Sequence, residues 1–130
     1  MRFYKIILGL CLITSLFVNP SKVIAEPIEI KTEINIKTYA FDIILNRWES
    51  KQWDYFDKLV EKESGWKENA QNPKSTAFGI GQFLNSTWKS VGCEKTNDKY
   101  EQVSCMIDYI ELRYETPQKA LSFHKSNNWY

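Results

Sequence analysis

Residues 63–83 read ESGWKENAQNPKSTAFGIGQF and contain the sharpest change of pattern in this chain of 130 residues. The stretch begins with a carboxyl group, Glu63, where the next apolar residue of a helix would be expected. It continues with Gly, Asn, Pro, Ser and Thr, which are typical of turns. Glu63 is therefore expected where a buried helix face meets an irregular segment.

The spacing of the residues before this stretch predicts a helix. Intervals of three and four residues place four side chains on one face: Trp53, Phe56, Val60 and Glu63. Ser50 is suited to cap the first turn, because its hydroxyl can accept a hydrogen bond from a backbone amide. Gly65 is suited to end the helix in a left-handed conformation. Glu61 is expected to face away from the apolar side.

Further helices are expected on both sides of residues 50–83. Phe41, Ile44 and Trp48 indicate a short helix or an irregular lead-in. After the irregular segment, a short helix around Trp88 and a long helix from about residue 96 to Tyr114 are expected. A last helix is predicted by Thr116-Pro117, a cap followed by proline at the first helical position. The chain is therefore expected to be predominantly helical.

The N-terminal part has a different pattern. Arg2 and Lys5 precede an apolar run at residues 6–18, and Ala25 offers a small residue for cleavage, as in a secretory signal peptide. The run is shorter than the roughly 20 apolar residues of a membrane-spanning helix. We expect export, with a retained anchor as the alternative. Residues 28–36 alternate isoleucine or threonine with polar residues, which indicates a strand or a mobile leader.

The charge and the cysteine content of the chain limit which partners and which kinds of site can be expected. The chain has 17 basic and 16 acidic residues, and cleavage after Ala25 would remove three basic ones, which changes the net charge from +1 to −2. No basic nucleic-acid surface is expected. Cys93 and Cys105 would then be the remaining cysteines, and an oxidising compartment favours a disulfide over two separate buried thiols. Two cysteines and one histidine predict no metal site, and no cofactor is expected.

Glu63 has the surroundings of a general acid. A carboxyl at the end of an apolar stripe is partly desolvated, which raises its pKa above the usual value of about 4.3. A carboxylic acid that stays protonated near neutral pH can donate a proton to a leaving oxygen. The alternative is a solvated surface group, which is the common state of a glutamate near a helix end.

Several short motifs follow one another from Glu63 onward. Together they resemble the lytic transglycosylase domain of the soluble type, over roughly residues 50–130. The chain most resembles short secreted bacterial forms that end in an aromatic-rich tail, here Phe123-His124 and Asn128-Trp129-Tyr130. The motifs are Glu63-Ser64-Gly65-Trp66, Asn69-Ala70, Asn72-Pro73, Ala77-Phe78-Gly79-Ile80-Gly81-Gln82-Phe83 and Thr87-Trp88.

The resemblance implies a single lysozyme-like domain that is mainly α, formally α+β with minimal β. It implies cleavage of the β-1,4 bond between N-acetylmuramic acid and N-acetylglucosamine in peptidoglycan. Glu63 would be the sole catalytic carboxyl, first as acid and then as base, and the product would be a 1,6-anhydro sugar. The expected organisation is a signal peptide at 1–25, a leader and lead-in helix at 26–49, and the transglycosylase domain at 50–130.

The resemblance also implies residues that bind the substrate. Ser64 and Gln82 match positions that line the family's cleft; the full expected set is Ser64, Phe78, Gly79, Gln82, Tyr109 and His124. Two departures stand out. Gly81 replaces a methionine that is common in the family, and Phe123-His124-Lys125 replaces a frequent Ala-Tyr-Asn segment. His124, Tyr109 or Tyr114 would then take the place of the missing tyrosine, or the acid is tuned differently.

Peptidoglycan glycan strands are the expected partner, and the chain is expected to be a monomer in the periplasm or cell-wall space. Three other readings remain open. A hydrolysing muramidase would need a second carboxylate, for which Glu68 is the candidate. A non-catalytic module would bind glycan without cutting it. A component of a secretion, conjugation or phage assembly would use the same activity with additional partners.

Overall fold

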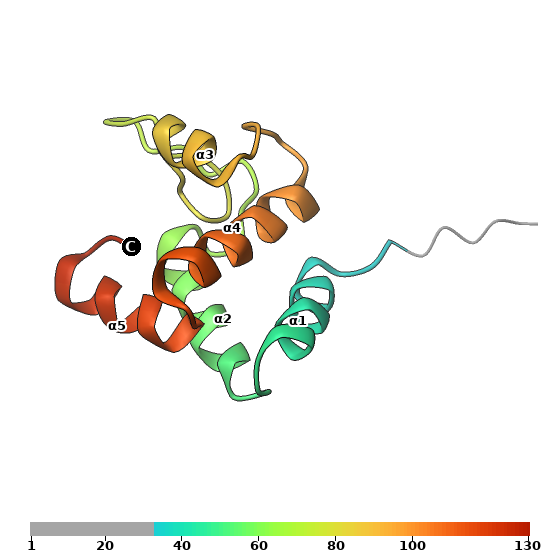
Figure 1. Ribbon diagram of the computed structural model, residues 1–130. Coiled ribbons are helices and arrows are strands. Elements are labelled where there is room, and N and C mark those ends of the chain that lie inside the picture. Colours follow the sequence, from blue (N-terminus) through green and yellow to red (C-terminus); the bar gives the residue numbers. More distant parts are fainter. Residues whose placement is uncertain (1–32) are drawn as a thin grey trace, which may run out of the picture. The chain divides into compact units, whose positions relative to one another are not determined.

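The computed structural model describes residues 33–130, which form one folded unit of five helices (Figure 1). Within this range the only β-structure is a pair of isolated bridges, from Phe78 to Gln71 and to Phe83. The prediction of a mainly helical, lysozyme-like domain is confirmed. No helix in the described range is long and apolar enough to cross a bilayer. The helices are α1 (Ile36–Arg47), α2 (Gln52–Glu63), α3 (Asn85–Val91), α4 (Lys99–Tyr114) and α5 (Pro117–Asn127).

The start of α1 corrects the strand prediction for its last residues. Asn35 caps this helix, since its side chain accepts a hydrogen bond from the amide of Lys37, and Ile36 is already helical. Ala40 and Ile44, four residues apart, are fully buried, so α1 belongs to the folded unit. The rest of the alternating segment and the predicted signal peptide lie in residues 1–32, outside the described range.

The helix ends confirm some predicted signals and contradict another. Ser50 does not cap α2, because the helix begins at Gln52 and its N-cap position is Lys51, which forms no side-chain hydrogen bond to the helix. Gly65 does adopt the left-handed conformation, with φ of +59°. Thr116 caps α5 through a hydrogen bond from the amide of Lys119, with Pro117 at the first helical position. The long helix α4 begins at Lys99, with Asp98 as its cap, three residues after the earliest predicted start.

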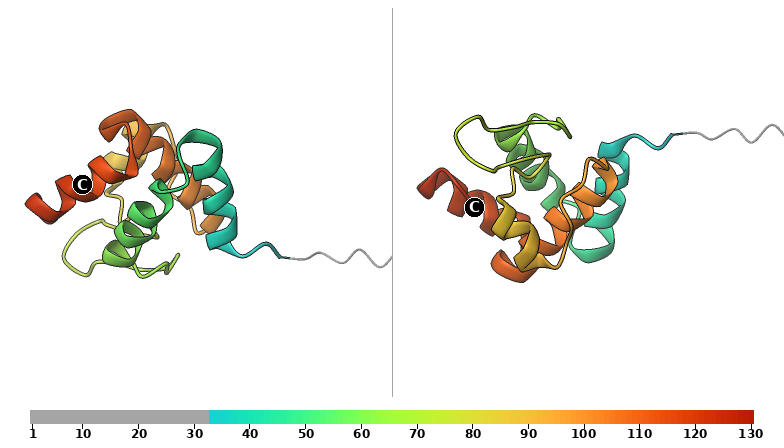
Figure 2. Two further views of the ribbon diagram at one scale, coloured as in Figure 1. Left: turned by 90° about the horizontal axis from the view of Figure 1, so that it is seen from below. Right: turned by 90° about the horizontal axis from the view of Figure 1, so that it is seen from above.

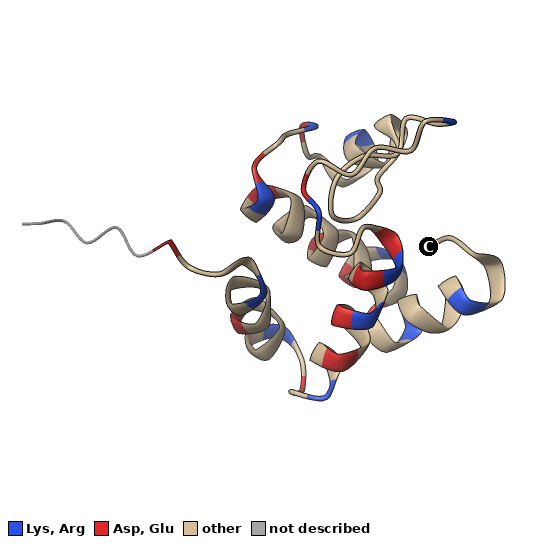
Figure 3. Cartoon of the chain, turned by 180° about the vertical axis from the view of Figure 1, so that it is seen from behind, with Lys and Arg blue, Asp and Glu red and all other residues tan. Residues whose placement is uncertain are grey.

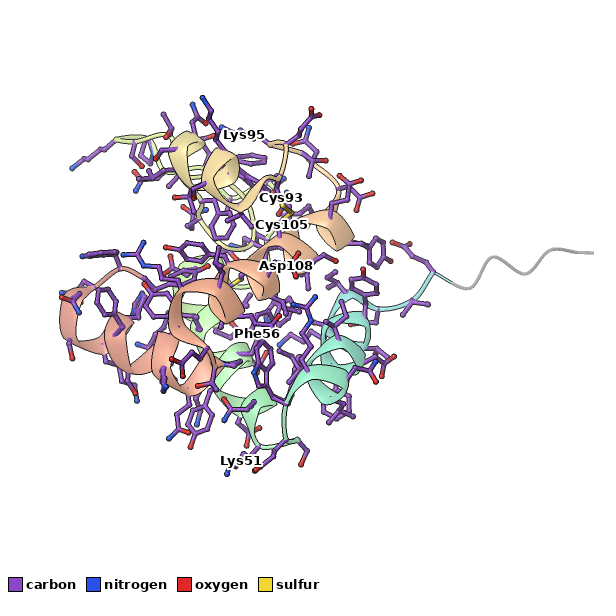
Figure 4. All side chains as sticks on the ribbon, in the orientation of Figure 1. Lys51, Phe56, Cys93, Lys95, Cys105 and Asp108 are labelled. Atoms are coloured by element: carbon purple, nitrogen blue, oxygen red, sulfur yellow. A yellow bond between two sulfur atoms is a disulfide. The ribbon has the colours of Figure 1, made fainter. Side chains whose placement is uncertain are left out.

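The core lies between α2, α4 and α5. In the views of Figure 2, α2 runs beside α5, and this helix pair has the most extensive contact in the fold. Phe56 of α2 is fully buried and lies between α2 and α4 in Figure 4. Each such side chain contributes about 1.5–3 kcal/mol to folding through burial. The same packing fixes the direction of α2, and therefore the position of Glu63 at its end.

The irregular segment that follows α2 is held to α4 by one buried amide. Gln102 is 1% exposed. Its Oε1 accepts a hydrogen bond from the amide of Ile80 at 2.8 Å. Its Nε2 donates to the carbonyl oxygens of Glu68 and Thr96, at 2.9 and 2.8 Å. Gly79 has φ of +79°, and a Cβ there would lie 2.6 Å from the Gln102 Oε1, so both backbone conformation and space require glycine.

A disulfide joins Cys93, just after α3, to Cys105 in α4 (Figure 4). It anchors a helix of only seven residues, which is too short to be stable alone. Around this framework Lys and Arg are interspersed with Asp and Glu on the helices (Figure 3). One cross-helix cluster is formed by Arg47, which contacts Asp108 and Glu111 at 2.7 Å each.

Replacing both cysteines, as Cys93→Ser with Cys105→Ser, should lower the free energy of unfolding by about 3 kcal/mol under oxidising conditions. The disulfide closes a loop over a sequence separation of 12, and this loop-closure entropy is lost from the unfolded state. Denaturant unfolding with and without a reductant measures the effect. Reductant should destabilise only the wild-type protein; equal midpoints for both proteins under oxidising conditions would contradict the prediction.

Candidate active site

Glu63 is the last residue of α2, and the chain turns away sharply after it. Gly65 and Trp66 both have left-handed backbone, with φ of +59° and +65°. The conformation of Trp66 is unusual for a bulky residue. It is held by a hydrogen bond from its indole N–H to Asp57 at 2.8 Å and by packing against Phe56. The sharp turn ends the helix at a point where the Glu63 side chain is only 14% exposed.

Burial raises the pKa of Glu63 to about 7, because the charged form loses much of its hydration. The helix terminus acts in the same direction, since the last turn of a helix carries partial negative charge that disfavours a carboxylate. Glu63 is therefore about half protonated at neutral pH. Such a carboxyl can both donate and accept a proton under physiological conditions.

His124 of α5 contacts the acid directly. Its Nε2 lies 2.9 Å from Oε1 of Glu63, and its side chain is 15% exposed. Burial lowers the pKa of His124, and the nearby charge of Lys62 acts in the same direction. The distance between the two side chains would allow an ion pair. However, the raised pKa of Glu63 and the lowered pKa of His124 both favour the uncharged form of the group. Near neutral pH we therefore expect a close polar contact of Glu63 with a neutral imidazole and not an ion pair.

A cleft of about 580 Å³ opens in front of Glu63. Its walls come from the irregular segment, the start of α3, the end of α4 and the residues after α5. Among the described residues that line it, Glu63 is the only one with a carboxyl group. The lining residues are Glu63, Asn72, Ala77, Gly81, Gln82, Phe83, Leu84, Ser86, Thr87, Tyr109, Arg113, Asn128, Trp129 and Tyr130.

Tyr130 forms a wall of this cleft. Its hydroxyl donates a hydrogen bond to the carbonyl oxygen of Gly81 at 3.0 Å. Burial raises the pKa of Tyr130 well above its ordinary value, so the hydroxyl remains a donor. A Cβ at position 81 would lie 2.9 Å from this hydroxyl oxygen. Tyr130 thus occupies the space next to Gly81, which accounts for glycine at the position where methionine was expected.

The structure brings some of the predicted residues into the cleft and places others behind it. Gln82 and Tyr109 line the cleft with Glu63. The amide of Gln82 also donates to the carbonyl oxygens of Ala70 and Gly79, at 3.1 and 2.9 Å, so this side chain braces the irregular segment. His124 is in contact with the acid and is not among the lining residues.

Three predicted residues support the cleft from outside. The hydroxyl of Ser64 donates to the carbonyl oxygen of Ile80 at 2.7 Å, which ties the end of α2 to the irregular segment. Gly79 packs against Gln102, and Phe78 lies under Lys95, whose Nζ is 5.0 Å from the ring centroid. The candidate second carboxyl, Glu68, is exposed and does not line the cleft.

Most of the lining residues, Arg113 and Tyr130 among them, were not predicted from the sequence to bind substrate. Arg113 stands four positions after Tyr109, so both side chains lie on one face of α4. This spacing could have predicted that Arg113 lies next to Tyr109. The position of Tyr130 had no local signal, because it depends on the path of the chain after α5. Asn128 at the end of α5 has left-handed backbone, with φ of +59°, and this turn directs the final residues to the cleft.

Comparison with known proteins gives one positive result. The family model described as the Transglycosylase SLT domain matches residues 45–106, which include Glu63, the irregular segment, α3 and the first half of α4. No curated protein and no solved structure matches the chain.

The raised pKa of Glu63 makes stability depend on pH. Between about pH 4.3, where a glutamate of the unfolded chain titrates, and pH 7, the folded state binds more protons than the unfolded state. Folding stability should therefore fall as pH rises through this window. Glu63→Gln lacks this effect, so its stability relative to wild type should increase by roughly 2–3 kcal/mol from pH 4 to pH 8, at about 1.4 kcal/mol per pKa unit.

Denaturant unfolding at a series of pH values measures this difference. Glu68→Gln, which removes an exposed carboxyl outside the cleft, serves as the control and should follow the wild-type curve. A constant difference between Glu63→Gln and wild type across the whole range would show that Glu63 titrates as an ordinary carboxyl.

Proposed function

Since residues 45–106 match the Transglycosylase SLT domain family, we propose that this protein cleaves the glycan strands of peptidoglycan with Glu63 as its acid and base. The bond cut is the β-1,4 linkage between N-acetylmuramic acid and N-acetylglucosamine. The product is a 1,6-anhydro-N-acetylmuramic acid end. The enzyme is a lyase, because no water is consumed.

The observation that carries this proposal is a single desolvated carboxyl in the cleft. Burial raises the pKa of Glu63 to about 7, and no second carboxyl is found among the described lining residues. Hydrolytic glycosidases normally use two carboxyl groups, one of which activates water or attacks the sugar. A cleft with one such group is better suited to a reaction in which the substrate supplies its own nucleophile.

The reaction has two proton transfers. Protonated Glu63 gives its proton to the glycosidic oxygen as the bond from that oxygen to C1 of N-acetylmuramic acid breaks, which leaves positive charge at C1. The C6 hydroxyl of the same sugar then attacks C1, and its proton passes to the Glu63 carboxylate. The carboxyl is restored, so a pKa near the working pH suits both steps.

We further propose that His124 is a positioning residue for the acid. As the neutral Nε2–H tautomer it donates to Oε1 of Glu63, which leaves Oε2 to carry the proton toward the substrate. When the proton leaves, the same hydrogen bond is made to a carboxylate and becomes stronger. An interaction that strengthens along the reaction lowers the barrier. His124 would thus replace the tyrosine that is missing from the Ala-Tyr-Asn position.

The family assigns the activity to the periplasm or cell wall, where peptidoglycan lies. Export through residues 1–25 agrees with this location and remains a prediction from the sequence, as do the monomeric state and any role in a secretion, conjugation or phage assembly. The disulfide between Cys93 and Cys105 is compatible with an oxidising compartment.

Purified peptidoglycan incubated with residues 26–130 should release anhydro-muropeptides, detected by mass spectrometry. Glu63→Gln should lower the rate by at least about 10²- to 10⁴-fold, because the amide can neither donate nor accept the proton at the glycosidic oxygen. Glu68→Gln is the matched control and should retain the wild-type rate. Products heavier by one water would identify a muramidase instead, and bound but uncut glycan would identify a binding module.

His124→Leu should lower kcat by roughly 10- to 100-fold with little change in KM, because a hydrogen bond to a charged group contributes about 1.5–3 kcal/mol. The loss of a donor to the carboxylate should also raise the pKa of Glu63 and move the alkaline limb of the kcat profile upward. His124→Gln retains an N–H donor and should recover part of the rate. Equal rates for the leucine and glutamine variants, with unshifted pH profiles, would rule out the positioning role.

A further inference from the structure

Arg113 has one guanidinium hydrogen bond among the described residues, from Nη1 to the hydroxyl oxygen of Tyr109 at 2.8 Å. An arginine side chain carries five N–H donors. It forms no ion pair within residues 33–130, although it stands between Glu111 and Glu115 on the chain. Those two carboxylates are paired elsewhere: Glu111 contacts Arg47, and Glu115 contacts Lys119.

Three aromatic rings hold the guanidinium in place. Its central carbon lies 5.7 Å from the ring centroid of Tyr109, 5.5 Å from that of Tyr114 and 5.1 Å from that of Trp129. Cation–π contacts of this kind orient the guanidinium without using its hydrogen-bond donors. The group is therefore preorganised, so little side-chain entropy would be lost when it binds a ligand.

Arg113 lines the same cleft as Glu63. The two are not paired: burial alone accounts for the raised pKa of Glu63. Arg113 is the only basic side chain among the described residues that line the cleft, so the cleft favours an anionic group at this wall. The fork of N–H donors on a guanidinium matches the two oxygens of a carboxylate.

We propose that Arg113 binds a carboxylate of the substrate next to the scissile bond, an inference that rests on the proposed function. The sugar rings of peptidoglycan and their N-acetyl groups are uncharged. Two kinds of carboxylate belong to the N-acetylmuramic acid unit: the lactyl carboxylate, when no peptide is attached, and the carboxylates of the stem peptide, when one is. Arg113 would thus make the cleft selective for peptidoglycan over uncharged chitin-type oligosaccharides.

The test measures ligand binding in the Glu63→Gln protein, which binds without cutting. Three tetrasaccharides are titrated by calorimetry: chitotetraose, peptide-free N-acetylglucosamine–N-acetylmuramic acid repeats, and the same repeats with stem peptides. Arg113→Gln in this background should weaken the binding of a carboxylate-bearing ligand roughly 10- to 100-fold, as expected for lost charged hydrogen bonds. Chitotetraose should bind with unchanged affinity. Arg113→Lys should show an intermediate loss of affinity, because lysine keeps the positive charge but lacks the paired N–H donors of the guanidinium.

The control is Lys58→Gln, which removes the same charge from an exposed position of α2 outside the cleft and should leave all three affinities unchanged. A loss with the peptide-free ligand would identify the lactyl carboxylate, and a loss confined to the peptide-bearing ligand would identify the stem peptide. Equal losses for all three ligands, no loss for any, or no binding at all would overturn the proposal. Binding that depends on Arg113, with no cleavage by the Glu63-containing protein, would overturn the proposed function and leave this site standing.

Discussion

The architecture of the cleft depends on the side chain of Gln102. One buried amide satisfies backbone groups at Glu68 and Ile80, in the irregular segment after α2, and at Thr96, between α3 and α4. A buried polar group without partners costs about 1–3 kcal/mol, so these hydrogen bonds specify one arrangement of the segment against α4. They also demand glycine at position 79. Together with the hydrogen bonds of Ser64 and Gln82, this anchor fixes the position of the segment that faces Glu63.

The Glu63 carboxyl is buried at a cost in free energy, and apolar packing on the same helix offsets that cost. Glu63 extends a stripe of apolar residues, and its burial disfavours the charged form. Phe56, Leu59 and Val60, on the same helix, are fully buried and stabilise the packing of α2 on α5. The two effects are linked, because the helix packing that stabilises the fold is the same packing that dehydrates the acid. The same face of α2 therefore stabilises the fold and raises the pKa of Glu63.

The helical framework could be predicted from the sequence because its signals are local. The stripe that ends at Glu63 and the Thr116-Pro117 start of α5 depend on residues within a few positions of one another. The start of α1 was missed because Ile36 fits a period of two as well as a helical face, and the cap at Asn35 decides between them. Gln102 and Tyr130 could not be predicted, since their partners lie 22 and 49 residues away along the chain.

The first described residues join the domain at the opposite end of α4 from the cleft. The hydroxyl of Tyr100 donates to the carbonyl oxygen of Ile34, and Lys99 contacts Glu33. Arg113, which lines the cleft, stands fourteen residues further along the same helix, a rise of about 20 Å. A tether attached ahead of residue 33 would therefore hold the domain by its far side. Anchorage to a surface at that point would leave the cleft turned outward, away from that surface.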